Sequence, residues 1–282
     1  MNYLKNMSEE QFETPCGVPD LLYDAHIHIL PVVNTLKNMF ATKKENECVK
    51  CKIRFGKLEN STLNTEVPRM FFMQTLLMLQ RFHDWTDVKE SYDTHDYYYH
   101  LNIPSQKAKK QKTALHVDSS TTKTIRSRTH FIKKPEGYQM QVEHTYCHDK
   151  NKALLHVNNR SNLDVEVEVQ QVSHIMVHTI PTVVVPFRVC LRTQTMFSLD
   201  NWNFIFTREW AAPTRIDAET KQFRDKDKDT CVHKMQIEFI GTTSYINNLT
   251  PDYFSVSLLL KICSLLGGNV IHLNPIIDNS PQ

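Results

Sequence analysis

The segment ECVKCKIRFG, residues 47–56, decides the predicted fold. Apolar residues occupy the odd positions from 49 to 55, and the cations Lys50, Lys52 and Arg54 occupy the even positions between them. Successive side chains of a β-strand point to opposite faces, so this alternation predicts a strand with one apolar and one cationic face. The cationic face would suit either a strand facing water or one lining the inside of a barrel.

Two helices are predicted to pack beside this strand. The first covers about residues 66–83, where apolar residues recur at helical spacing and Pro68 suits the first turn. The second covers about residues 251–266. Thr250 is its predicted N-cap, Pro251 stands in its first turn, and Gly267 follows its end.

Between these helices the chain holds a series of short alternating segments, which is typical of an antiparallel sheet or barrel. They are residues 91–103, 124–132, 138–147, 153–157, 163–170, 174–178, 183–191, 194–199, 203–208 and 232–240. The polar runs at 105–112 and 225–229 are predicted loops. We expect an α+β, mainly β fold, with an N-terminal arm over residues 1–45 and one domain over residues 46–282.

Composition narrows the functional classes. The 282 residues carry a formal net charge of +2, so any nucleic-acid binding must depend on a local patch. Six glycines are few for the Gly-rich turns of a nucleotide-binding α/β fold. No apolar run approaches about 20 residues, so we expect no membrane partner. The seven cysteines are an odd number without dense spacing, which favours a reducing, intracellular location.

Three short patterns offer metal ligands. Asp24, His26 and His28 form an Asp-x-His-x-His, as in the zinc sites of amidohydrolases, although satisfied histidines on a strand would look the same. Glu166 and Glu168 share a strand face and suit a hard divalent cation or, more simply, solvent. The Cys-x-x-Cys at 48–51 has no second pair, so we interpret it as two separate thiols.

Taken in order, several segments resemble the RNA 5′-triphosphatase module of mRNA capping enzymes from large DNA viruses and fungi. The resemblance covers roughly residues 47–265 and implies a closed antiparallel eight-stranded β-barrel, the triphosphate tunnel. The segments that carry it are KCKIRFG at 50–56, the Tyr-rich stretch at 97–99, the basic stretch at 124–129, RTQTMFS at 192–198, WNFIFTR at 202–208 and KMQIEFIG at 234–241.

The departures from this family fall on its metal site. In the family, glutamates of the first and last strands hold manganese or magnesium inside the tunnel. The matching positions here are Lys50, Lys52, Lys234, Gln236 and Glu238. A lone carboxylate among ammonium groups holds a divalent cation poorly, because like charges repel. The resemblance therefore implies a barrel interior lined by cations, with no metal cofactor.

The favoured hypothesis is a catalytically inactive viral relative of the capping triphosphatase. It would act as a structural or interaction subunit beside other transcription, capping or virion proteins, in the host cytoplasm or the virion. Its basic interior would bind phosphate or an RNA 5′ end. The predicted anion-binding residues are Lys50, Lys52, Arg54, Arg126, Arg128 and Arg192.

Two alternatives stay open. One is an active RNA 5′-triphosphatase dependent on manganese or magnesium, in which Glu238, Glu166 and Glu168 hold the metal. The other is an amidohydrolase-like metal hydrolase built on His26 and His28.

Overall fold

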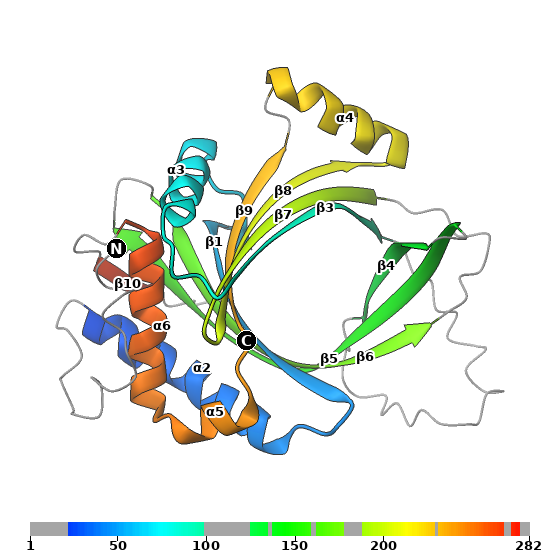
Figure 1. The fold of residues 1–282 in the computed structure, drawn as a ribbon. Coiled ribbons are helices and arrows are strands. Elements are labelled where there is room, and N and C mark those ends of the chain that lie inside the picture. Colours follow the sequence, from blue (N-terminus) through cyan, green and yellow to red (C-terminus); the bar gives the residue numbers. More distant parts are fainter. Residues whose placement is uncertain are drawn as a thin grey trace, which may run out of the picture.

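The computed structural model describes residues 22–98, 125–134, 137–158, 162–177, 188–228, 231–267 and 272–276. A large, strongly curved antiparallel sheet dominates this part of the chain (Figure 1). Its main strand order is β10-β5-β6-β1-β9-β8-β7-β3, with β2 beside β1 and β4 beside β5. The strands are β1 (Glu47–Glu59), β2 (Thr62–Asn64), β3 (Asp87–Tyr98), β4 (Ile125–Lys134), β5 (Gly137–Asn158), β6 (Asp164–Val177), β7 (Arg188–Leu199), β8 (Trp202–Ala212), β9 (Val232–Phe239) and β10 (His272–Ile276).

Helices cover the outside of this curve. Two of them, α3 and α6, lie where the sequence predicts helices. The Thr250 side chain caps α6 by accepting a hydrogen bond from the Tyr253 amide at 3.2 Å, and Pro251 stands in its first turn. The described helices are α2 (Tyr23–Thr42), α3 (Arg69–Gln80), α4 (Arg215–Lys228), α5 (Thr243–Asn248) and α6 (Pro251–Leu265).

The main hydrophobic core lies between the convex face of the sheet and helices α2, α3, α5 and α6, while α4 packs in a smaller separate cluster. The apolar positions of β1, Cys51, Ile53 and Phe55, are at most 1% exposed and belong to this core. Within this core, the ring of Phe254 from α6 packs edge-on against the ring of Phe239 from β9, with 5.1 Å between the ring centroids. Because side chains alternate along a strand, the charged positions of β1 face the concave side of the sheet.

The predicted closed barrel is wrong: over the described strands, the sheet curves strongly but does not close. The edge strands β3 and β4 approach within 8 Å at their Cα atoms, yet no backbone ladder joins them in the described residues. The pairing of β3 with β7 shifts register between Ser91 and Thr94. Such a bulge twists a strand and interrupts the regular row of donors and acceptors that a closing ladder needs.

Several predicted boundaries also need correction. β5 joins the predicted strands at 138–147 and 153–157, and β6 joins those at 163–170 and 174–178. The predicted loop at 225–229 belongs to α4 as far as Lys228. The polar run at 105–112 lies outside the described residues. No helix within the described ranges is long and apolar enough to cross a membrane.

Candidate functional site

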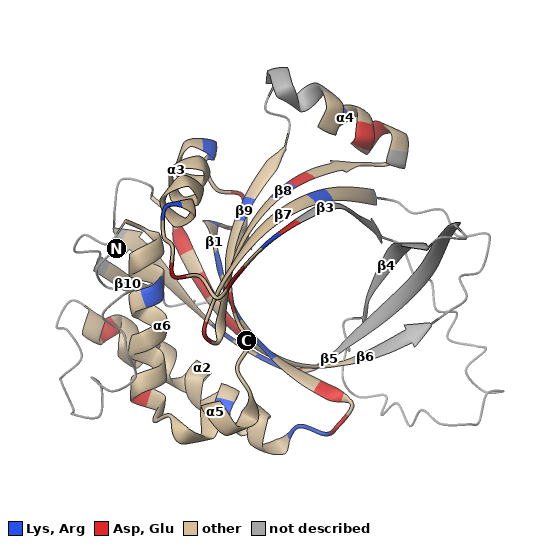
Figure 2. Cartoon of the chain, viewed as in Figure 1, with Lys and Arg blue, Asp and Glu red and all other residues tan. Residues whose placement is uncertain are grey.

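Charged residues are frequent along the strands of the curved sheet (Figure 2), and the pairing registers place many of them on its concave face. They come from six neighbouring strands, β5, β6, β1, β9, β8 and β7, and cations outnumber carboxylates among the side chains described there. The cations are Lys50, Lys52, Arg54, Lys150, Lys152, Arg192 and Lys234, and the carboxylates are Asp164, Glu166, Glu168, Glu209 and Glu238.

The pairing of β1 with β6 explains how oppositely charged residues meet. Lys52 stands opposite Glu168, and Arg54 stands opposite Glu166. The Arg54 guanidinium binds both carboxylates, donating from Nη2 to Glu166 and, at 2.9 Å, to Glu168. Glu166 is 4% exposed and Glu168 is 1% exposed, so this arginine compensates two carboxylates that have lost most of their water.

Lysines of the flanking strands complete this group. From β5, Lys150 binds Glu168, and Lys152 lies 3.8 Å from Glu166. From β1, Lys52 Nζ lies 3.4 Å from Glu238 Oε1, a carboxylate of β9. Each of these carboxylates therefore contacts at least one cation.

A second charged group lies nearer the other side of the concave face, where β7, β8 and β9 run together. Glu209 is 1% exposed and accepts hydrogen bonds from Arg192 Nε at 2.6 Å and from Lys234 Nζ at 2.9 Å. Burial by itself raises the pKa of Glu209, but the charges and hydrogen bonds of Arg192 and Lys234 outweigh it. The pKa consequently lies below its ordinary value of 4.5.

The structure therefore separates the predicted anion-binding residues. Lys50, Lys52 and Arg54 lie together on β1, whereas Arg192 lies in the second group. Arg126 and Arg128 lie on β4, opposite Thr145 and Glu143 of β5, and their side chains are outside the described part.

Sequence reasoning missed two lysines of this face, Lys150 and Lys152. Their spacing of two residues was the available signal, since it places both side chains on one face of a strand. The HDKNK run that contains them fell between the predicted strands at 138–147 and 153–157, so it was not assigned to a strand.

The carboxylates Glu166, Glu168 and Glu238 do not form a metal cage in this arrangement. No cluster of three His, Cys, Asp or Glu side chains that could hold a metal ion occurs among the described residues. The side chain of Lys52 lies between the strands of Glu168 and Glu238, and Arg54 occupies the two β6 carboxylates. A divalent cation would have to displace these ammonium and guanidinium groups to gain oxygen ligands.

The Asp-x-His-x-His pattern lies in helix α2, so its predicted strand is wrong. Residues two apart in a helix point in very different directions, which keeps His26 and His28 from forming a shared metal site. His26 is 3% exposed, its Nδ1 is hydrogen-bonded to Ser255 Oγ, and its Nε2 lies 3.2 Å from Asp252. These contacts give His26 a structural role between α2 and α6.

The two cysteines of the Cys-x-x-Cys pattern lie in different environments. Cys51 is buried in the core, whereas Cys48 is half-buried. Burial, with a smaller contribution from the charge of Glu238, raises the pKa of Cys51 to about 12. Such a thiol stays protonated and is a poor metal ligand.

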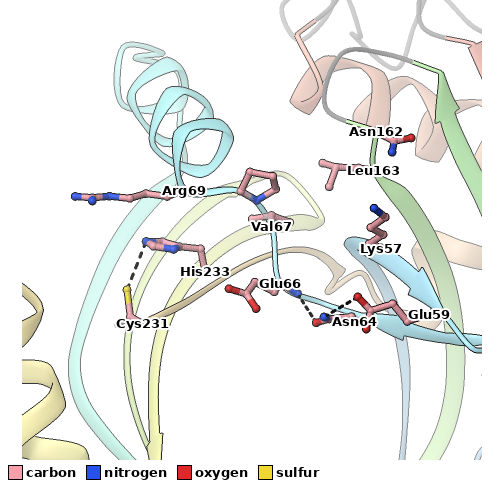
Figure 3. A pocket seen from close by; sticks show the side chains of 11 residues that line it. Lys57, Glu59, Asn64, Glu66, Val67, Arg69, Asn162, Leu163, Cys231 and His233 are labelled. Atoms are coloured by element: carbon pink, nitrogen blue, oxygen red, sulfur yellow. Dashed lines mark hydrogen bonds between the residues drawn. The ribbon is translucent and has the colours of Figure 1, made fainter. Parts of the chain in front are cut away.

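A pocket of about 410 Å³ lies away from the concave face, near the start of α3 and the first residues of β9 (Figure 3). Cys231 Sγ lies 3.5 Å from His233 Nε2 at its wall. Acidic and basic side chains line it together, so its charge favours neither an anion nor a cation. The lining residues are Lys57, Glu59, Asn64, Glu66, Val67, Pro68, Arg69, Asn162, Leu163, Cys231 and His233.

Comparison with solved structures identifies the architecture. The S. pombe Pct1 RNA triphosphatase in complex with the Spt5 CTD superposes with a TM-score of 0.50 and 11% identity, over 92% of this chain and 97% of that one. This chain has the fold of an RNA triphosphatase. A second structure of S. pombe Pct1 gives 0.49 at 12% identity, over 89% of this chain and 93% of that one.

The RNA triphosphatase domain of a trifunctional mimivirus mRNA capping enzyme gives a TM-score of 0.45 at 9% identity, over 86% of this chain and 95% of that one. No family model matches the sequence. No curated protein matches it significantly either.

Proposed function

We propose that this protein is a catalytically inactive relative of the mRNA-capping RNA 5′-triphosphatases, of viral origin, that binds phosphate or an RNA 5′ end on its concave face without hydrolysing it. One observation carries this proposal. Lys50, Lys52 and Lys234 stand on the concave face, at positions where the resemblance implies metal-binding glutamates, and the nearby carboxylates already contact cations.

The charge balance of the face supports anion binding over metal binding. Cations outnumber carboxylates on the six strands, so the surface keeps a local positive excess after its ion pairs have formed. Lysine ammonium groups and arginine guanidinium groups are the usual protein partners of phosphate oxygens. Without a metal to activate water and polarise the γ-phosphate, bound triphosphate would remain intact.

A role as an interaction subunit fits the same picture. One structure of S. pombe Pct1 was determined with the Spt5 CTD bound, which supports protein partners for this fold. We propose that this chain joins viral transcription, capping or virion proteins.

Phosphate release from triphosphate-ended RNA tests the proposal. The protein is incubated with γ-labelled RNA and Mn²⁺ or Mg²⁺, and released phosphate is compared with that from a buffer control. We expect no release above the control, together with salt-sensitive binding of triphosphate-ended RNA that exceeds binding of the same RNA with a 5′ hydroxyl. Turnover, or equal binding of the two RNAs, would reject it.

The active alternative keeps one supporting observation: Glu168 and Glu238 flank Lys52 from the two strands beside β1, and Glu166 lies on the same face. If a metal displaced the cations, these three carboxylates could hold it. Manganese-dependent turnover that is lost in Glu238→Ala would establish that alternative.

A further inference from the structure

The pocket beside the start of α3 is a cavity that the proposed function leaves unassigned (Figure 3). Its volume of about 410 Å³ falls in the range of sites for small organic ligands. Residues from the end of β1, from the segment before α3 and from the start of β9 line it. Separate parts of the chain thus converge on one space that is large enough for a small molecule.

One wall of this pocket holds a thiol beside an imidazole. Cys231 directly precedes β9 and His233 is the second residue of that strand, so their spacing of two residues turns both side chains to the same face. Cys231 Sγ lies 3.5 Å from His233 Nε2, within hydrogen-bonding reach for sulfur. The ring of Phe72 packs against the imidazole, with 4.7 Å between the ring centroids. The imidazole is therefore held where it can accept the thiol proton.

The surroundings of Cys231 differ from those of two other buried or partly buried thiols. Burial raises the pKa of Cys51 to about 12 and the pKa of Cys263 to about 11, so both thiols stay protonated. Neither of them lines the pocket. Cys231 is also buried, but it borders a cavity and has a neighbouring base. This combination is typical of a reactive thiol rather than of a structural one.

The pocket also carries two charges of opposite sign that do not neutralise each other. Lys57 and Glu66 both line it and are both exposed. Neither residue forms an ion pair within the described part of the chain. An ammonium group and a carboxylate therefore remain available at one cavity. A ligand that carries both a carboxylate and an ammonium group would pair with both of them.

We propose that this pocket binds a small zwitterionic disulfide and that Cys231 forms a mixed disulfide with it. Lys57 binds a carboxylate of the ligand and Glu66 binds its ammonium group. The Cys231 thiol gives its proton to His233 Nε2, and the resulting thiolate attacks one sulfur of the ligand. The ligand's S–S bond breaks as the new S–S bond forms, and the departing thiolate takes the proton from His233. Cys231 is oxidised and the departing half of the ligand is reduced to a thiol, whatever the concave face binds.

Mass spectrometry of the native full chain tests this proposal, with oxidised glutathione as the zwitterionic disulfide and bis(2-hydroxyethyl) disulfide as an uncharged one. Each rate is divided by the rate of the same reagent with the urea-unfolded chain, which removes the difference in intrinsic reactivity. We expect the first adduct at Cys231, and a relative rate roughly tenfold higher for glutathione than for the uncharged disulfide. Exposure alone would instead favour the less buried thiols of Cys48, Cys147 and Cys263.

Variants separate recognition of the ligand from reactivity of the thiol. Lys57→Gln/Glu66→Gln should lose the preference for glutathione and keep the reaction with the uncharged disulfide. Lys44→Gln/Glu45→Gln removes the same two charges at exposed positions outside the pocket, and it should keep the wild-type preference. His233→Asn should slow both reactions roughly tenfold or more, because it removes the base.

Each part of the proposal can fail separately. Earlier modification of another described cysteine would show that Cys231 is not the reactive thiol. An unchanged preference for glutathione in Lys57→Gln/Glu66→Gln would reject the zwitterion site, and this test stays valid if the His233 variant unfolds because both of these residues are exposed. A wild-type rate in a folded His233→Asn variant would reject the imidazole as the base.

Discussion

Replacing Glu209 with glutamine should destabilise the protein, because this buried carboxylate forms ion pairs with two cations. Glu209 is 1% exposed, and its partners Arg192 and Lys234 lie 2.6 and 2.9 Å away. The variant Glu209→Gln keeps the side-chain shape, so no cavity term contributes. It removes the negative charge that Arg192 and Lys234 both contact.

The magnitude follows from the burial of the three partners. Breaking a fully buried ion pair by removing one member costs about 3–5 kcal/mol. Here the Arg192 and Lys234 side chains are 15% and 29% exposed, so water screens part of the released charge. We therefore expect a loss of about 2–3 kcal/mol in the free energy of unfolding at neutral pH.

Urea unfolding followed by circular dichroism measures this loss, with Glu45→Gln as the control. Glu45 is exposed, and its replacement should change stability by no more than about 0.5 kcal/mol.

The pH dependence has a definite sign. Because the folded-state pKa of Glu209 is lowered, its contribution is complete above the ordinary value of 4.5 and is lost as the pH falls through the lowered pKa. The stability difference between wild type and Glu209→Gln should therefore shrink in acid. Equal stability at neutral pH, or a difference that persists in strong acid, would refute this reasoning.

Two further substitutions test buried groups elsewhere. Burial lowers the pKa of Lys261 from 10.5 to about 8. Between pH 8 and pH 10.5, Lys261 therefore carries a proton in the unfolded chain but not in the folded protein. The free energy of unfolding of the wild type should rise over this pH range by up to about 3 kcal/mol. Urea unfolding at several pH values should show no such rise for Lys261→Met. His26→Ala should cost about 2–3 kcal/mol of stability, because it removes buried contacts to Ser255 and Asp252. Its zinc content by atomic absorption should equal that of the wild type, and stoichiometric zinc lost in the variant would restore the metal hypothesis.

Local signals predicted part of this fold well. The alternation of apolar and charged residues at 47–56 predicted β1 directly, because one face of this strand packs on helices and the other face is charged. The start of α6 was readable because Thr250 and Pro251 act within one turn of their own positions. The likeness to the RNA triphosphatase fold was recognisable from the order of weak motifs, whereas the open sheet between β3 and β4 was not.

Signals that depend on distant partners were out of reach. Lys150 and Lys152 fell between two predicted strands, and only the pairing of β5 with β6 shows that they stand beside Glu166 and Glu168. Arg54 is separated from its two glutamates by more than a hundred residues of sequence, so only the β1–β6 pairing reveals their contact. The helical setting of His26 was missed because a short apolar run with polar insertions fits either a helix or a strand.

A crystal structure of the protein with Mn²⁺ and tripolyphosphate tests the central claim most directly, because it shows whether the concave face binds the anion or the metal ion. The account predicts an anion held on the concave face beside Lys50 and Lys52 of β1, with no manganese at Glu166, Glu168 or Glu238. An anomalous manganese peak coordinated by those carboxylates would contradict it.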